Sequence, residues 1–190
     1  MSMRVRSTDE RSRSSEQSLG DDLIVRTRFL PPRLRPSLLE RPRVDALLAR
    51  LEEQPLLLLR AEAGYGKTTA IASYLNRQKR RFFWYSLGSS DADPVVFLLH
   101  LIYLFRELDA GIGERALHFL VQKEDASRLW APAVDALAND LLDALPRDEK
   151  AVLVLDDYCT VNRPEINVLV ERFIEQAPPQ LHLVVTARSM

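Results

Sequence analysis

Short apolar runs alternate with amphipathic stretches along most of the chain, which predicts an alternation of strands and helices. Strands are predicted at residues 55–60, 81–87, 150–156 and 181–186, and the leucine run of the first favours a buried parallel strand. Apolar residues at helical spacing predict helices at 38–51, 67–78, 95–108, 114–122, 131–145 and 164–176. This pattern indicates an α/β fold in which helices cover both faces of a parallel sheet.

The pattern is missing from the N-terminal segment. Residues 1–22 are rich in Ser, Arg and acidic residues and contain few apolar ones, so we expect a disordered leader. The next residues, 23–50, are strongly basic and contain prolines that favour an extended entry before the first helix. Ordered structure is therefore expected over residues 23–190.

Composition narrows the classes of protein to which the chain can belong. A net charge of −1 provides no general attraction to nucleic acid or to anionic membranes. The single cysteine, Cys159, excludes an internal disulfide framework and a cysteine-based zinc site. The longest apolar run, at 95–105, is too short to cross a bilayer as a helix, and no signal peptide is recognisable. The chain is expected to be soluble and cytoplasmic.

The segment between the first strand and the second helix carries the strongest chemical signal. It matches the phosphate-binding loop pattern except that Ala61 replaces the first glycine. Glycines at 64 and 66 allow the backbone to approach phosphate, and backbone N–H groups there can form an anion nest. The alternative is a glycine-containing turn that arose by chance, but the flanking strand and helix argue against it. The residues expected to bind ATP or ADP are Ala61, Glu62, Ala63, Gly64, Tyr65, Gly66, Lys67, Thr68 and Thr69.

A second signal lies at the end of the strand 150–156, where an apolar run is followed by two carboxylates. Asp156 is expected to hold Mg²⁺ together with the Thr68 hydroxyl, because this ion prefers oxygen ligands. Asp157 is expected to orient or deprotonate the attacking water, although it is shorter than the glutamate used by many such enzymes. The alternative is an ordinary acidic turn at the end of a strand.

One further strand, 81–87, lies between the loop and the acidic strand in the sequence. This order predicts a phosphate-loop NTPase of the type with an additional central strand, and it argues against simple nucleotide kinases. Other polar and aromatic residues have weaker patterns. His100, His118 and His182 lack a partner at metal-ligand spacing and are expected to pack structurally. Of the two neighbouring aromatics Trp84 and Tyr85, one is expected to pack in the core and the other at its margin.

Several further segments of the sequence belong together in one order: 27–33, 39–43, 61–68, 84–87, 93–94, 153–158 and 186–188. In this order they resemble one family, the MalT-like large ATP-binding LuxR-family transcriptional regulators. The combination is far more specific than the phosphate loop alone. It resembles the N-terminal nucleotide-binding domain of these signal-transduction ATPases, over about residues 23–190.

The resemblance implies a three-layer phosphate-loop NTPase domain that binds ATP or ADP with Mg²⁺ and acts as a switch. It implies a catalytic role for Asp157, and a contact between Arg188 and the γ-phosphate, with a solvated surface arginine as the alternative. Arg28 and Arg33 become candidates for enclosing the base, although solvated surface positions are slightly favoured for them.

The family continues with a fifth core strand and with winged-helix, helical-repeat and helix-turn-helix regions, and we expect none of these in the 190 residues of this sequence. We therefore expect no DNA contact and an incomplete sheet in which the strand 55–60 lacks one neighbour. The unpaired edge favours modest stability or self-association. Three functions stay open: an ATP-binding switch of a transcriptional regulator, a stand-alone and weak Mg²⁺-dependent ATPase, and a non-catalytic interaction fragment.

Overall fold

A computed structural model describes residues 23–35, 41–121 and 126–188 of the chain. Its four strands form one sheet in which every neighbouring pair is parallel, in the order β1-β4-β3-β2. The strands are β1 (Leu56–Arg60), β2 (Arg81–Ser86), β3 (Ala151–Asp156) and β4 (Leu181–Ala187). This confirms the predicted α/β fold with a parallel sheet. The predicted disordered leader, residues 1–22, lies outside the described residues.

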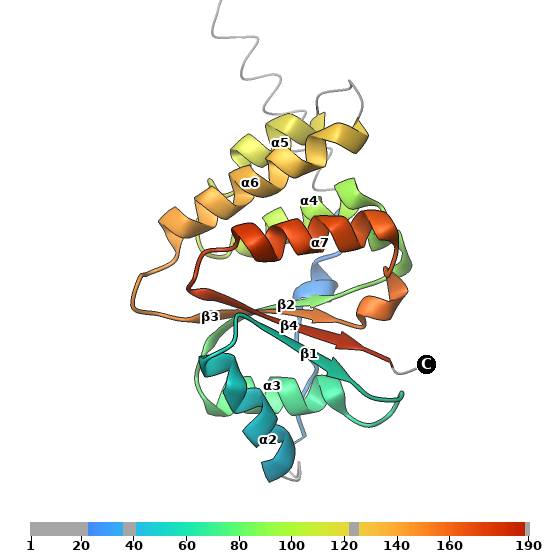
Figure 1. Cartoon of the computed structure of the whole chain (residues 1–190), viewed down its shortest axis with the longest axis vertical. Coiled ribbons are helices and arrows are strands. Elements are labelled where there is room, and N and C mark those ends of the chain that lie inside the picture. Colours follow the sequence, from blue (N-terminus) through green and yellow to red (C-terminus); the bar gives the residue numbers. More distant parts are fainter. Residues whose placement is uncertain (1–22, 36–40, 122–125, 189–190) are drawn as a thin grey trace, which may run out of the picture.

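Helices cover both faces of the sheet, so the molecule has three layers (Figure 1). On one face lie α2 (Pro42–Leu48), the short helix η2 (Ala49–Glu52) and α3 (Lys67–Arg77). On the other face, α4 (Pro94–Phe105) and α7 (Pro164–Gln176) lie next to the sheet, and α5 (Glu114–Val121) and α6 (Ala126–Ala144) lie farther out. Three more single-turn helices are η1 (Arg26–Phe29), η3 (Ser89–Ala92) and η4 (Tyr158–Thr160).

The strand order separates the loop-bearing strand from the acidic strand. β4 pairs with β1 on one side and with β3 on the other, and thus lies between them. The additional-strand type is therefore correct, but β4, rather than the strand 81–87, is the one inserted in space. β2 lies at the opposite edge of the sheet, where it pairs with β3 alone among the described strands. This arrangement brings the ends of β1, β4 and β3 together.

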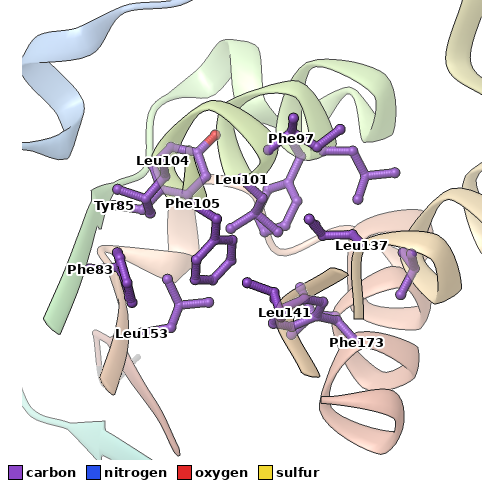
Figure 2. Packing of buried hydrophobic residues seen from close by; sticks show 14 of the residues in the cluster. Phe83, Tyr85, Phe97, Leu101, Leu104, Phe105, Leu137, Leu141, Leu153 and Phe173 are labelled. Carbon is purple, nitrogen blue, oxygen red and sulfur yellow. The ribbon is translucent and has the colours of Figure 1, made fainter. Parts of the chain in front are cut away.

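Two hydrophobic cores, one on each face, hold the layers together. The larger core packs α4, α6 and α7 against the sheet through aromatic and leucine side chains (Figure 2). Its members seen in the figure include Phe83, Phe97, Phe105, Leu137, Leu153 and Phe173. The smaller core packs α2 and α3 against the opposite face and includes Leu48, Ile71, Leu75, Trp84 and Val184. Central strands are consequently buried on both sides, and every residue of β3 is buried.

β1 departs from the prediction of a buried strand. Its leucines alternate in exposure, because Leu57 and Leu59 pack against the smaller core while Leu56 and Leu58 are 38% and 50% exposed. The strand lies at the sheet edge, and the helices on the α4–α7 face do not cover these two side chains. The position of β1 at the edge of the described sheet accounts for the difference from the prediction of a buried strand.

The other edge strand, β2, is covered by η1. Phe29 packs edge-on against both Tyr85 and His100, with ring centroids 6.0 Å and 5.9 Å away. Tyr85 is completely buried, and Trp84 is buried on the opposite face of the same strand. The expectation that one of these two aromatics lies at the margin of the core is therefore wrong, since η1 and α4 complete the burial of β2.

The start of α4 is stabilised by a capping residue and a proline. Asp93 caps α4, accepting hydrogen bonds from the N–H groups of Val95 and Val96, and Pro94 occupies the first helical position. α7 has the predicted bounds, whereas α6 begins earlier than predicted, so that Pro132 lies inside it. In the parts of the chain that the structure describes, no helix combines the length and apolarity needed to cross a bilayer.

Candidate nucleotide-binding site

The loop after β1 has the backbone geometry of a phosphate cradle. Gly64 and Gly66 adopt positive φ angles of 83° and 74°, a conformation that costs side-chain-bearing residues energy. Gly66 directly precedes α3, and no side chain caps this helix, so its first N–H groups point into the loop without a side-chain partner. A Cβ built on Gly64 would meet no atom within 4 Å, so the space beside the loop is open.

Lys67 lies across this loop. Its Nζ donates hydrogen bonds to the carbonyl oxygens of Ala61, at 2.6 Å, and of Glu62, at 3.0 Å. These bonds keep the ammonium group at the mouth of the loop, where an anionic ligand would find a positive charge next to the N-terminus of α3. The other loop residues, Ala63, Tyr65 and Thr69, follow the same strand-loop-helix path, and Tyr65 is 62% exposed.

Asp156, at the end of β3, is tied to the loop through Thr68. The Thr68 hydroxyl donates to Oδ1 of Asp156 at 3.0 Å, although the two residues are 88 positions apart. The Asp156 carboxylate is buried, and within the described residues nothing donates a hydrogen bond to its Oδ2. One hydroxyl and one carboxylate oxygen of the kind that Mg²⁺ prefers are thus brought side by side.

Asp157 has a different partner from Asp156, namely Arg188. Arg188 Nη2 donates to Oδ2 of Asp157 at 2.8 Å, and its Nε donates to Oδ1 at 3.2 Å. Burial alone would raise the pKa of Asp157, but the hydrogen bonds from Arg188 and Cys159 hold it below its ordinary value. The same pair raises the pKa of Arg188 above its ordinary value. Asp157 is therefore an ionised carboxylate whose charge is already partnered.

The predicted site residues therefore lie at the carboxyl-terminal ends of the three adjacent strands β1, β4 and β3. Figure 1 shows these strand ends on the same side of the sheet. Ligands of open α/β sheets bind at the carboxyl ends of the strands. The residues present fit a nucleotide with Mg²⁺, because the open loop, the Lys67 ammonium group and the Thr68–Asp156 pair supply phosphate and metal ligands together. No cluster of three or more His, Cys, Asp or Glu residues suited to a metal occurs in the described part of the chain.

Comparison with known proteins finds relatives of similar sequence. The chain is 33% identical over 149 residues to the HTH-type transcriptional regulator MalT of Vibrio cholerae, and this stretch covers 78% of the chain. It is 30% identical over 150 residues to the regulator of the same name from Cronobacter sakazakii. This chain is homologous to the N-terminal region of MalT regulators. It matches only 16% of the length of either relative.

Solved structures resemble this MalT-like region more distantly. A structure of Drosophila ORC bound to DNA matches 92% of the chain and 43% of its own chain, with 16% identity and a TM-score of 0.47. A structure of PCH-2 from C. elegans matches 78% of the chain and 36% of its own, with 14% identity and a TM-score of 0.33. No protein-family model matches the chain.

Two further residues join the site without having been predicted to do so. The Arg41 guanidinium donates to the carbonyl oxygen of Tyr65 at 2.6 Å and lies against Gly66. Thr186 bonds to both members of the acidic pair. The sequence signal for Thr186 is a polar residue in an otherwise apolar central strand, and that for Arg41 is only its place in a basic segment.

Arg28 and Arg33, the candidates for enclosing the base, lie in different surroundings. Arg33 is exposed, as the favoured alternative predicts. Arg28 is only partly exposed, and it pairs with the carboxylate of Asp91, which is completely buried, rather than with the loop. It also donates to Ser90 Oγ at 3.0 Å. The basic segment thus supplies an ion pair to the core, and Arg41 rather than Arg28 reaches the loop.

The histidines and the cysteine also differ from one another. His100 is buried, accepts from the N–H of Val25 at 3.2 Å and lies 2.9 Å from the carbonyl oxygen of Val96. Burial lowers its pKa, so it packs as a neutral side chain, as predicted. His182 is buried too, whereas His118 is exposed, so the packing prediction fails there. Cys159 lies at the site, with its Sγ 3.1 Å from Asp157 Oδ1.

Proposed function

We propose that the chain binds ATP or ADP with Mg²⁺ at the loop 61–69 and that the bound nucleotide acts as a regulatory switch. The observation that carries this proposal is the hydrogen bond between Thr68 and Asp156, which joins a phosphate loop to a buried strand-end carboxylate. Lys67 would hold the β- and γ-phosphates, and the Thr68 hydroxyl and Asp156 would hold the metal and its water shell. Mg²⁺ supplies neutralisation of phosphate charge when bound.

The pairing of Asp157 with Arg188 favours a switch over an enzyme with rapid turnover. A carboxylate that accepts two hydrogen bonds from an arginine is less available to orient or deprotonate water. Arg188 would gain a competing anionic partner when a γ-phosphate is present, and it would thereby distinguish ATP from ADP. In this proposal the exchange of partners by Arg188 starts the conformational response.

The comparisons support a regulatory setting, since the relatives are transcriptional regulators by name. We place the chain in the cytoplasm for the same reason. The proposal assigns nucleotide sensing to this region and does not assign it DNA contact. The second candidate, a stand-alone ATPase, uses the same residues, and Asp157 in its position next to Asp156 is the observation that favours it.

Replacement of Lys67 with alanine tests nucleotide binding. The variant Lys67→Ala should lose most of the thermal stabilisation that ATP and Mg²⁺ confer, because the loop then lacks its only lysine charge. At a ligand concentration of about 100 times Kd, the wild-type chain should gain about 2.7 kcal/mol in its free energy of unfolding. Differential scanning fluorimetry and titration calorimetry measure the two effects.

The matched control is Lys79→Ala, which removes an exposed lysine just beyond the opposite end of α3 and should bind ATP as the wild type does. An equal loss of ATP-dependent stabilisation in both variants would show that Lys67 has no specific role in binding. Absence of any nucleotide-dependent shift in the wild type would contradict both the switch and the ATPase, leaving an interaction fragment. Steady phosphate release at about 1 s⁻¹ or faster would favour the ATPase.

A further inference from the structure

The hydroxyl of Thr186 lies at the centre of the acidic corner. It donates a hydrogen bond to Oδ1 of Asp156 at 2.7 Å, and it accepts one from the backbone N–H of Asp157 at 2.8 Å. Thr186 is only 1% exposed, so water does not compete for either bond. One side chain therefore contacts both residues of the Asp-Asp pair, one through its carboxylate and the other through its backbone.

The first of these bonds sets the orientation of Asp156. Thr68, from α3, and Thr186, from β4, both donate to the same carboxylate oxygen from different elements. Two donors on Oδ1 restrict rotation of the carboxylate about its own axis, and they leave Oδ2 without a donor among the described residues. Thr186 thus directs the second oxygen without occupying it.

The second bond fixes the backbone corner that follows β3. Asp157 has a positive φ of 63°, an uncommon conformation for a residue with a side chain. Its N–H group would lose its bond if the corner opened, so the Thr186 hydroxyl stabilises the turn that aims the Asp157 side chain. Thr186 in β4 and Arg188, the residue that follows the end of β4, both contact this corner.

We propose that Thr186 is a positioning residue of the magnesium–nucleotide site, whose buried hydroxyl orients the Asp156 carboxylate and holds the corner from which Asp157 projects. The inference rests on the proposed function, since it presupposes that Asp156 serves a bound magnesium ion. It also gives the inserted strand β4 a chemical role. Only a strand between β1 and β3 can place a hydroxyl against Asp156 while pairing with the loop-bearing strand.

The test compares Thr186→Val, which removes the hydroxyl, with Thr186→Ser, which keeps it. The affinity for ATP is measured by calorimetry with Mg²⁺ and again with EDTA, and the ratio of the two values gives the gain due to the metal. Thr186→Val should lower this gain about tenfold or more, as loss of an outer hydrogen-bonding partner does at metal sites. Its affinity for ATP in EDTA should stay near that of the wild type, because Lys67 and the loop are unchanged.

Thr186→Ser should retain the gain from Mg²⁺ to within about threefold, since its hydroxyl can make both bonds. A folded Thr186→Val with the full gain, or a Thr186→Ser that loses it, would overturn the proposal. If Thr186→Val does not fold, as thermal unfolding without nucleotide will show, Thr186→Cys replaces it. Its thiol is a weak donor, so a reduced gain is expected and an undiminished one contradicts the proposal.

The wild-type measurement separates this inference from the function on which it rests. A wild-type chain that binds ATP equally with and without Mg²⁺ would refute the assignment of Asp156 to the metal, whatever the variants show. A wild-type chain with a clear gain that Thr186→Val preserves would refute the role of Thr186 alone.

Discussion

Individual residues in this chain owe their roles to their burial. Arg28 and Arg77 both pair with an aspartate, but Asp91 is completely buried whereas the pair of Arg77 and Asp45 lies at the surface. The Asp91 carboxylate also accepts a hydrogen bond from the backbone N–H of Gly88 at 2.7 Å. This buried carboxylate therefore has both a cationic partner, Arg28, and a backbone donor. The ion pair of Arg28 should therefore contribute more to the free energy of unfolding than the ion pair of Arg77.

We predict that Arg28→Met lowers the free energy of unfolding by about 3 kcal/mol, because it leaves a buried carboxylate without its cation. Methionine keeps much of the apolar stem, so the loss reports the charge rather than the packing. Chemical denaturation monitored by the fluorescence of the two tryptophans provides the measurement.

Arg77→Met is the control for this measurement. It breaks a partly exposed ion pair and should cost less than about 1 kcal/mol. Similar losses in the two variants would show that burial of Asp91 does not set the contribution of Arg28.

At the scale of the elements, the two edge strands of the sheet differ in how far they are covered. β2 is covered by η1, with Phe29 against Tyr85, whereas β1 leaves Leu56 and Leu58 exposed. An edge strand with free backbone groups and exposed leucines favours pairing with another chain. The loop-bearing strand is therefore the element most prone to association.

We predict concentration-dependent association of the chain, reduced in Leu58→Lys, because a charge at the centre of β1 opposes strand pairing. Sedimentation velocity over a range of concentrations gives the measurement. Val168→Lys, at a residue of α7 with 51% exposure, is the control and should associate as the wild type does. Equal behaviour of the two variants would place the contact elsewhere.

For the molecule as a whole, burial predicts an uneven distribution of stability. All of β3, and β4 up to its last residue, are buried, whereas β1 is half exposed at an edge. Backbone amides in β3 and β4 should therefore exchange only on global unfolding, and those of β1 through local opening.

Hydrogen exchange followed by mass spectrometry should show exchange in β1 at least about tenfold faster than in β3 and β4. β2, the other edge strand, should be better protected than β1 because η1 packs on it. ATP with Mg²⁺ should slow exchange in the loop 61–69 and in β1. Protection of β1 equal to that of β3 without nucleotide would contradict the proposed distribution.

Local patterns in the sequence were enough to identify most elements and the centre of the site. Period and length indicated the strands and helices, and the glycines at 64 and 66 marked the loop of the candidate site. These features can be read from sequence because each depends on neighbours within a few positions. The acidic end of β3 was visible for the same reason.

Tertiary structure alone decided which distant groups meet. It placed β4 rather than β2 between β1 and β3, exposed the leucines of β1, and paired Arg28 with Asp91. It also brought the Thr186 hydroxyl to Asp156, 30 positions away in the chain. Local periodicity does not specify the partner of a buried polar group, because that partner is set by strand order and by the packing of the helices. The sequence by itself therefore determined the glycine-containing loop after β1 and the acidic end of β3, and the fold decided how they are joined.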